Sequence, residues 1–440
     1  MQNMKINDKN QEWIGNIPKN WTFKKIKYVL AQRNEKNIPI KSKDILSLTA
    51  KQGVIPYTEK EGGGNKPKTD FSAYKLAYPG DIVMNSMNIL SGAVGLSKYF
   101  GCVSPVYYML YCSNDEDDIR YFYYVFANKA FQSSLLGIGN GILMKESENG
   151  TFNTIRMRIP IEKLNNMSIP YPKPEIQKAI ANFLDKKIGK IDEVSKKIQQ
   201  EITNLEEYRN SIIVKAVTKG LNPNVLMKDS GIPWIGKIPQ QWNIEPIYLH
   251  FYQGKNKNNL GKEKNLLSLS YGKIIRKNIN SVGGLLPSSY NTYNIVEAGD
   301  IIIRPTDLQN DKRSLRTGLV TEHGIITSAY LDLKPKTKNS SRYYHYLLHA
   351  YDIQKVFYNM GNGVRQGLNF SEFSKLKILV PNLKNQLAIS DYLDNLNKKI
   401  SKIILNKKSQ LEKLNQYKQS IIYEYVTGKK QVPTEEGAKE

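Results

Sequence analysis

The sequence predicts an α+β protein with two globular mixed α/β domains, separated by two long antiparallel coiled-coil helices and related by a pseudo-twofold internal repeat. Three observations support this prediction. A tryptophan-containing motif occurs twice, short apolar runs broken by Gly, Pro and Asn follow each copy, and each half ends in a long proline-free stretch. The 440 residues, 40% of them hydrophobic, exceed one ordinary domain and allow each half to bury its own core.

The repeat begins with the nonapeptide WIGNIPKNW at residues 13–21, which returns as WIGKIPQQW at residues 234–242. Two tryptophans at the same spacing, followed by further matches in the same order, indicate a duplicated unit. The further matches include Gly80-Asp81-Ile82 with Gly299-Asp300-Ile301, and Phe183-Leu184-Asp185 with Tyr392-Leu393-Asp394. We therefore predict a first domain, a spacer helix, a second domain, a second spacer helix and a polar tail. Their ranges are 1–173, 174–220, 221–382, 383–431 and 432–440.

The two proline-free stretches have the apolar spacing of long helices that pack on each other. Apolar residues recur mostly three and four positions apart, as in a coiled-coil seam, and charged residues cover the other faces. Neither helix should be stable alone in water, so we expect the two to pack antiparallel. From Asp185 to Lys219 the first helix would span on the order of 50 Å, long enough for a spacer. The residues predicted to pack between the helices are Ile191, Ile198, Ile202, Leu205, Tyr208, Ile212, Ile400, Ile404, Leu411, Leu414, Tyr417 and Ile421.

The charge of the chain favours a polyanionic partner such as nucleic acid or an acidic membrane surface, and the charge alone does not choose between them. There are 64 Lys+Arg against 40 Asp+Glu, a formal net charge of +24. Residues 22–173 hold 20 basic against 13 acidic residues and residues 244–380 hold 19 against 10, so both domains share the excess. Cationic and amide side chains in their loops can contact phosphates and base edges. The candidate DNA-binding residues are Lys66, Lys68, Asn85, Asn88, Asn140, Lys145, Arg304, Arg313, Arg316, Arg365 and Gln366.

Several patterns that could suggest a catalytic or metal site have simpler interpretations. His345 and His349 are four residues apart, but the glutamate of an HExxH zinc motif is absent, so we expect a packing or surface role. The repeated Asp81 and Asp300 suit turns that lead into strands. No Ser/His/Asp or Cys/His grouping can be assembled. We therefore predict no catalytic residue, no metal ligand and no cofactor bound by this chain.

Glycine-rich and tyrosine-rich segments also have structural interpretations. Gly139-Asn140-Gly141 and Gly361-Asn362-Gly363 lie outside any phosphate-binding fingerprint, and we interpret them as tight turns. The tyrosine clusters at residues 121–124 and 343–346 could stack on unpaired bases. Their matched positions in the two copies instead favour core helices.

The cellular compartment follows from the cysteines and the apolar runs. Cys102 and Cys112 have no CxxC or CxxH spacing, which argues against a disulfide framework or a structural zinc site. The first 18 residues lack the apolar core of a signal peptide, and no stretch approaches the ~18 apolar residues of a membrane span. We expect a reduced, cytoplasmic protein with no membrane partner.

The repeat organisation resembles the DNA-specificity subunit of type I restriction-modification systems over nearly the whole chain. The segments that carry the resemblance are the motifs at Trp13 and Trp234, the Gly-Asp-Ile strands at Gly80 and Gly299, residues 361–369 leading into 376–381, and the helices at Gln177 and Gln386. The order of these motifs, present twice, is more specific than any one of them.

This resemblance implies a non-catalytic subunit in which two target-recognition domains each read one half of a bipartite, asymmetric double-stranded DNA site. It also implies that the helices dock two modification subunits that methylate adenine at N6, and that restriction subunits can join the complex. S-adenosylmethionine, ATP and Mg are then expected on these partner subunits.

Three alternatives remain open at this stage. The specificity subunit of a related bifunctional restriction-methylation system would share all these features. A single-chain DNA-modifying enzyme is a weaker interpretation, because the (N/D)PP(Y/F) tetrad with which adenine methyltransferases hold a flipped base is absent from the sequence. A purely structural coiled-coil scaffold predicts no sequence-selective DNA binding.

Overall fold

The computed structural model describes residues 12–50, 52–60, 67–142, 156–279, 289–306, 308, 315–336, 339–356, 358, 360 and 367–433. These residues form two compact units. The first unit comprises Met1–Ile198 and Ser409–Glu440, and the second comprises Gln199–Lys408. Each unit therefore combines one globular domain with a part of each long helix, α4 (Pro174–Lys219) and α8 (Leu383–Val426).

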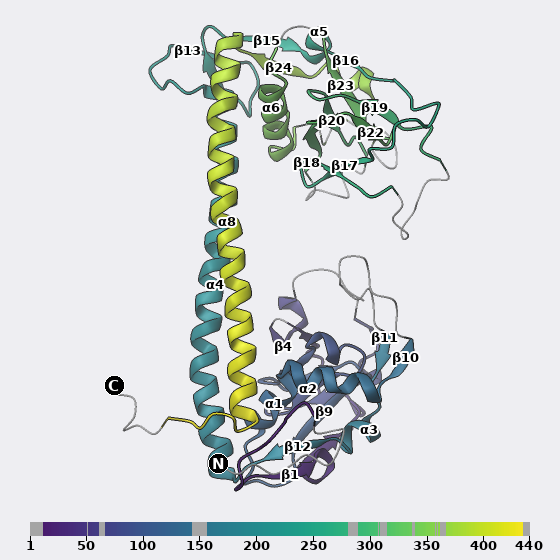
Figure 1. Ribbon diagram of the computed structural model, residues 1–440, viewed down its shortest axis with the longest axis vertical. Helices are drawn as coiled ribbons and strands as arrows, with labels where there is room; N and C mark the ends of the chain where they lie inside the picture. Colours follow the sequence, from purple (N-terminus) through teal and green to yellow (C-terminus); the bar gives the residue numbers. More distant parts are fainter. Residues whose placement is uncertain are drawn as a thin grey trace. The chain divides into compact units, whose positions relative to one another are not determined.

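The first unit is built around a four-stranded antiparallel sheet (Figure 1). Its strands, in spatial order, are β2 (Leu30–Arg33), β9 (Tyr107–Cys112), β6 (Ile82–Asn85) and β7 (Val94–Leu96). Four antiparallel strand pairs surround this sheet. They are β1 (Thr22–Lys25) with β12 (Ser168–Tyr171), β3 (Leu46–Thr49) with β4 (Gly53–Pro56), β5 (Lys75–Ala77) with β8 (Gly101–Val103), and β10 (Asn140–Ile142) with β11 (Arg156–Arg158).

The central strand β6 begins at the turn that the Gly-Asp-Ile motif predicted. Gly80 adopts a positive φ of 89°, and the Asp81 carboxylate accepts a hydrogen bond from the backbone N–H of Tyr78 at 2.9 Å. The same carboxylate pairs with the Arg33 guanidinium at 2.9 Å. The turn interpretation of Asp81 is confirmed.

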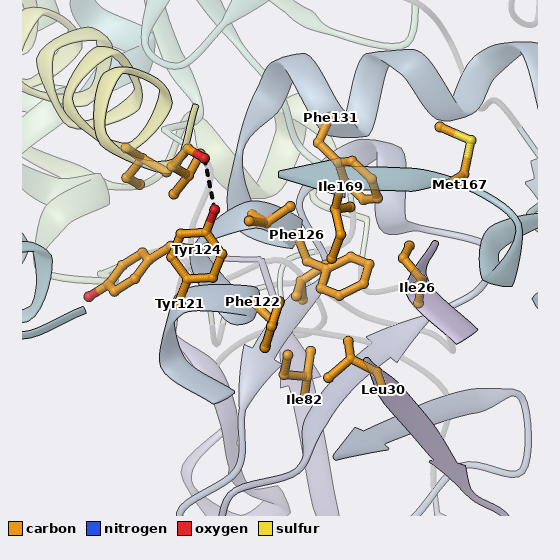
Figure 2. Packing of buried hydrophobic residues seen from close by; sticks show 14 of the residues in the cluster. Ile26, Leu30, Ile82, Tyr121, Phe122, Tyr124, Phe126, Phe131, Met167 and Ile169 are labelled. Carbon is orange, nitrogen blue, oxygen red and sulfur yellow. Dashed lines mark hydrogen bonds between the residues drawn. The ribbon is translucent and has the colours of Figure 1, made fainter. Parts of the chain in front are cut away.

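Helices α1 (Ile119–Ala127), α2 (Lys129–Ser134) and α3 (Ile161–Asn165) complete the first unit. The Asp118 side chain caps α1 by accepting from the backbone N–H of Arg120. Tyr121, Phe122 and Phe126 from α1 are fully buried and pack with apolar residues of the strands (Figure 2). This confirms the prediction that the first tyrosine cluster belongs to a core helix.

The core of the first unit also contains the end of α8. Ile421, Ile422, Tyr425 and Val426 belong to the same buried cluster as the strands of the N-terminal domain. The Tyr121 hydroxyl lies 3.1 Å from the carbonyl oxygen of Pro170 and 3.0 Å from that of Val426, so its proton can be donated to either. A segment about 300 residues away in sequence is thereby fixed inside this core.

The second unit has a four-stranded sheet of the same connectivity. Its strands, in spatial order, are β16 (Phe251–Gln253), β23 (Leu331–Pro335), β20 (Ile301–Ile303) and β21 (Thr317–Leu319). The accompanying antiparallel pairs are β15 (Asn243–Pro246) with β24 (Lys377–Val380), β17 (Leu267–Ser270) with β18 (Lys273–Arg276), β19 (Asn294–Val296) with β22 (Gly324–Ile326), and β13 (Met227–Asp229) with β14 (Lys237–Pro239). The helices are α5 (Ile247–His250), α6 (Ser341–Ile353) and α7 (Phe370–Phe373).

The buried tyrosines of α6 form the same contacts as those of α1. Tyr343 and Tyr344 lie in the core, which confirms the interpretation of the second tyrosine cluster. The Tyr343 hydroxyl contacts the carbonyl oxygens of Leu379, at 3.2 Å, and Val217, at 3.4 Å. Val217 lies near the C-terminal end of α4, so a helix end completes this core as well.

The long helices pair antiparallel within each unit. In the first unit the rings of Phe183 and Tyr425 lie 4.4 Å apart, and Lys418 binds Asp192 at 2.6 Å, so α8 runs opposite to α4 (Figure 1). In the second unit Lys407 binds Glu201 at 2.5 Å. The predicted spacer ranges were 174–220 and 383–431, and the helices span Pro174–Lys219 and Leu383–Val426. None of the described helices has the length and apolar character that crossing a membrane requires.

Most residues predicted to pack between the helices are covered, and two are not. The buried ones are Ile191, Ile202, Ile400, Ile404 and Ile421, and the half-buried ones are Ile198, Leu205, Ile212, Leu411 and Leu414. Tyr208 is 53% exposed and Tyr417 is 55% exposed, so their predicted packing role is wrong. The cause is that each tyrosine stands beside the apolar stripe, on the flank of the helix that its neighbour does not cover.

A buried carboxylate in the second sheet has an unusual environment. Asp332 of β23 is 1% exposed, and its oxygens accept no hydrogen bond from the described residues. The nearest cation, the Lys334 ammonium at 3.7 Å, is already hydrogen-bonded to Asp300. Burial, together with the neighbouring Asp300 charge, raises the pKa of Asp332 to about 7.

Substitution of Asp332 by Asn should stabilise the chain more at high pH than at low pH. Because the folded-state pKa is raised, the folded state retains a proton that the unfolded state releases, so stability falls as pH rises from about 4 to above 7. The gain in unfolding free energy from Asp332→Asn should be larger at pH 8 than at pH 5 by roughly 2 kcal/mol, measured by denaturant unfolding. Asp300→Asn removes the ion pair with Lys334, so it should lower the unfolding free energy at both pH values. Equal gains for Asp332→Asn at pH 5 and 8 would contradict the assignment.

Candidate nucleic-acid interface

A hollow of about 650 Å³, lined by both polar and apolar residues, lies at the end of the first unit's central sheet. Lys68, Asn85 and Asn88, three of the candidate DNA-binding residues, line it together. Tyr57 and Tyr107 line it as well. The surface thus combines a cation for phosphates, amides for base edges and rings for stacking.

Asn85 is placed at this surface by the strand that precedes it. Ile82, Val83 and Met84 are fully buried, whereas Asn85, the last residue of β6, is half-buried. The Asn85 N–H donates to the Ala93 carbonyl at 3.1 Å, which fixes the backbone where it leaves the sheet. The Asn85 Oδ1 accepts from the Met87 N–H at 3.0 Å, so the amide is held by a local turn.

The other residues of the hollow come from less regular segments. The Lys68 side chain is exposed, and its backbone N–H donates to the Tyr74 hydroxyl at 2.8 Å. Asn88 is exposed and directly precedes a short 3₁₀ helix, Ile89–Ser91. Sequence reasoning missed Lys60, whose ammonium lies 5.6 Å from the Tyr57 ring centroid, and Tyr107. The signal that could have identified them is their position near strand ends, since Tyr107 is the first residue of β9 and Lys60 lies four residues after β4.

In the second unit, Arg304 occupies the position that Asn85 has in the first. It directly follows β20, whose three isoleucines are fully buried, and it is itself half-buried. Its backbone N–H donates to the Arg316 carbonyl at 2.8 Å, as the Asn85 N–H does to that of Ala93. The ends of β6 and β20 therefore present different polar side chains from the same backbone position.

Arg316 is not at the surface where the sequence analysis placed it. Its side chain is fully buried, and its guanidinium donates to the Thr306 carbonyl and, at 3.1 Å, to the Tyr358 hydroxyl. Its backbone N–H donates to the Asp352 carboxylate at 2.5 Å. Arginine carries five donors, so when buried it can hold several oxygen atoms of one loop at once. Arg316 therefore supports the backbone at Arg304 and Thr306, directly after β20.

The remaining candidate residues are elsewhere. Asn140 is exposed and begins strand β10, so the predicted tight turn at residues 139–141 is wrong. The reason is that β11 supplies a pairing strand that sequence spacing did not reveal. The Asn140 Oδ1 accepts from the Lys163 ammonium at 3.0 Å, and Asn140 does not line the hollow. Lys66, Lys145, Arg313, Arg365 and Gln366 lie outside the described residues, as does the segment 361–363.

The histidine pair on α6 is a packing feature. The rings of His345 and His349 lie 6.1 Å apart. Burial lowers the pKa of His345 to about 4 and that of His349 to about 3, so both are neutral near pH 7. Within the described residues, no group of three or more His, Cys, Asp or Glu side chains is arranged to hold a metal ion.

Comparison with known proteins identifies the family. The model of the type I restriction-modification DNA specificity domain matches residues 18–204 and 318–413. The chain belongs to this family of specificity subunits. The two matched segments include the central strand β6 and the start of α4 in the first unit, and β21, α6 and the start of α8 in the second.

The chain is similar to several type I specificity proteins over nearly its whole length. A protein of Methanocaldococcus jannaschii, assigned as the specificity subunit of the type I restriction enzyme MjaX, is 22% identical over 448 residues, covering 96% of each chain. A solved structure from work on complex assembly and conformational transition of a type I system has a TM-score of 0.63 at 12% identity and covers 93% of this chain and 98% of its own. That likeness confirms the mixed α/β fold. The HsdS subunit of Thermoanaerobacter tengcongensis is 13% identical, with a TM-score of 0.44 and coverage of 94% and 98%.

The hollow of the first unit should contribute to the salt dependence of DNA binding. Each phosphate that a lysine neutralises releases counterions, so Lys68→Gln should reduce the slope of log affinity against log salt by about 0.9 and weaken binding equally for all sequences. Titration of labelled duplex DNA between low and moderate salt measures this slope. Lys197→Gln, on the exposed side of α4, is the matched control and should leave it unchanged. An unchanged slope for Lys68→Gln would show that this lysine does not contact a DNA phosphate.

Proposed function

We propose that this specificity subunit binds a bipartite, asymmetric double-stranded DNA site, with one half-site read by each globular domain. The observation that carries this proposal is the position shared by Asn85 and Arg304. Both stand where a buried central strand leaves its sheet, and they differ in chemistry, as two readers of unlike half-sites would. The net charge of +24 supports contact with a polyanion.

We further propose that the subunit is non-catalytic and docks two modification subunits along its helices. S-adenosylmethionine, ATP and Mg would then belong to the modification and restriction subunits. The exposed apolar residues of the helices support a docking surface. They are Val194 and Tyr208 on α4, and Leu383, Leu387, Tyr392, Ile403, Leu405 and Tyr417 on α8. Apolar side chains grouped on a helix and left exposed commonly mark a protein interface.

Methylome sequencing tests the proposed function directly. A host that expresses this chain with its modification subunit should acquire N6-methyladenine in a split sequence with a fixed unspecific gap. The purified chain alone should transfer no methyl group from labelled S-adenosylmethionine to DNA. Methyl transfer by the chain alone would favour the single-chain enzyme. Absence of any sequence-selective binding in the presence of the modification subunit would favour a scaffold.

Helix length should set the gap between the half-sites. α4 contains 46 residues, so it runs on the order of 70 Å. Insertion of four helix-forming residues after Gln199, matched by four after Lys408 in α8, adds about 6 Å. The gap should lengthen by about one to two base pairs while both half-sites stay the same, because a base pair rises about 3.4 Å. Methylome sequencing measures the gap, and an unchanged gap would refute the spacer role.

The exposed tyrosines should be needed for partner docking. Tyr208→Ala combined with Tyr417→Ala removes two partly exposed aromatic side chains, so affinity for the modification subunit should fall at least about tenfold. Circular dichroism should show unchanged helix content, since neither ring is buried between the helices. Tyr28→Ala combined with Tyr248→Ala, which alters two exposed tyrosines outside α4 and α8, is the matched control. Equal affinity of both double variants, measured by calorimetry, would exclude this docking surface.

A further inference from the structure

We propose that Asn85 and Arg304 are specificity-determining residues, with Asn85 reading an adenine in one half-site and Arg304 a guanine in the other. The inference rests on the proposed function and names the chemistry of two contacts within it. Three features of each residue lead to it: the backbone position, the hydrogen bonds that hold that backbone, and the chemistry of the side chain.

The backbone at both positions is rigid. β6 lies between β9 and β7, and β20 lies between β23 and β21. Asn85 is the last residue of one such doubly paired strand, and Arg304 directly follows the other. The strand residues before them are fully buried. The N–H of each residue is bonded to a carbonyl across the following loop, at 3.1 Å for Asn85 and 2.8 Å for Arg304. A side chain that reads a base edge needs such a fixed origin, because the contact depends on the positions of two atoms at once.

The side chain of Asn85 retains the groups that adenine requires. Its Oδ1 accepts one hydrogen bond, from the Met87 N–H, and an amide oxygen has a second lone pair. The amide nitrogen offers donors. Asparagine can therefore accept from the adenine N6 amino group and donate to N7, a bidentate contact in the major groove. Lys68 and Asn88 line the same hollow and can position the backbone of the bound strand.

The side chain of Arg304 suits a different base. A guanidinium donates to O6 and N7 of guanine, the commonest specific contact between a side chain and DNA. Beneath this position, the buried Arg316 donates to the carbonyl oxygen of Arg304, at 3.5 Å, and to that of Thr306. The corresponding position in the first unit is Ala93, whose carbonyl accepts from Asn85. The second unit thus uses a buried arginine to hold the loop from which its reading residue projects, so Arg316 is a positioning residue.

Two substitutions at Asn85 separate base reading from a structural role. Asn85→Asp keeps the oxygen that accepts from the Met87 N–H and removes the donor to adenine N7, whereas Asn85→Ala removes both. If Asn85 reads adenine, both variants lose the preference for adenine at one position of one half-site, by about 5- to 150-fold, and Asn85→Asp gains preference for cytosine. If Asn85 only holds the turn, Asn85→Asp keeps the wild-type preference, which would overturn the proposal.

The measurement uses the full chain with its modification subunit and selection from a randomised duplex library followed by sequencing. The half-site read by the other unit is an internal control and should not change with either Asn85 variant. Arg304→Lys keeps a positive charge but removes the paired donors. It should therefore reduce the preference for guanine at one position of the other half-site by a similar factor. Lys68→Gln should weaken binding without changing any base preference.

The outcomes distinguish this inference from the proposed function. If the wild-type complex selects no sequence, the proposed function fails. If it selects a split sequence that the Asn85 and Arg304 variants leave unchanged, the proposed function stands and this assignment of reading residues is refuted.

Discussion

The hydrogen bond from a buried tyrosine to the end of a long helix is the contact on which each unit depends. The Tyr121 hydroxyl reaches the Val426 carbonyl, and the Tyr343 hydroxyl reaches that of Val217. A hydroxyl buried without a partner is costly, so each tyrosine fixes both its own helix and the helix end that it contacts. In the first unit the same hydroxyl also contacts Pro170 of β12, four residues before α4 begins. One side chain thereby joins α1, β12 and α8.

Each unit separates the part that maintains the fold from the part that can vary. The turn carboxylate Asp81 pairs with Arg33 of β2, whereas its counterpart Asp300 pairs with Lys334 of β23. In the second sheet Gly254 directly follows β16, and any side chain at this position would collide with Asp332. The turn carboxylate of each unit therefore has a cationic partner, although the partner comes from a different strand in the two units. Where the buried central strands end, the two units carry different side chains, Asn85 and Arg304.

The sequence was informative where periodicity and duplication decide the structure, and less so where single loops do. The apolar spacing identified both long helices nearly to their ends, and the Gly-Asp-Ile motif identified the turn before β6. Lys68, Asn85 and Asn88 line one hollow, whereas Asn140, predicted with them, does not, and their role in DNA binding stays a prediction. Arg316 was misplaced, since a residue next to a polar loop can be buried under it. Tyr208 and Tyr417 were misplaced because residues beside a heptad stripe can face either the partner helix or solvent.

The use of helix ends to complete the cores also has a consequence for biosynthesis. The second unit is continuous in sequence, from Gln199 to Lys408, so all of its core residues are available once that stretch has been made. The core of the first unit needs residues 421–426, which are synthesised after the whole of the second unit. Domains ordinarily fold in the order of their synthesis. Here the domain made first is completed last, and until α8 arrives its apolar binding site for the helix end is open to chaperones.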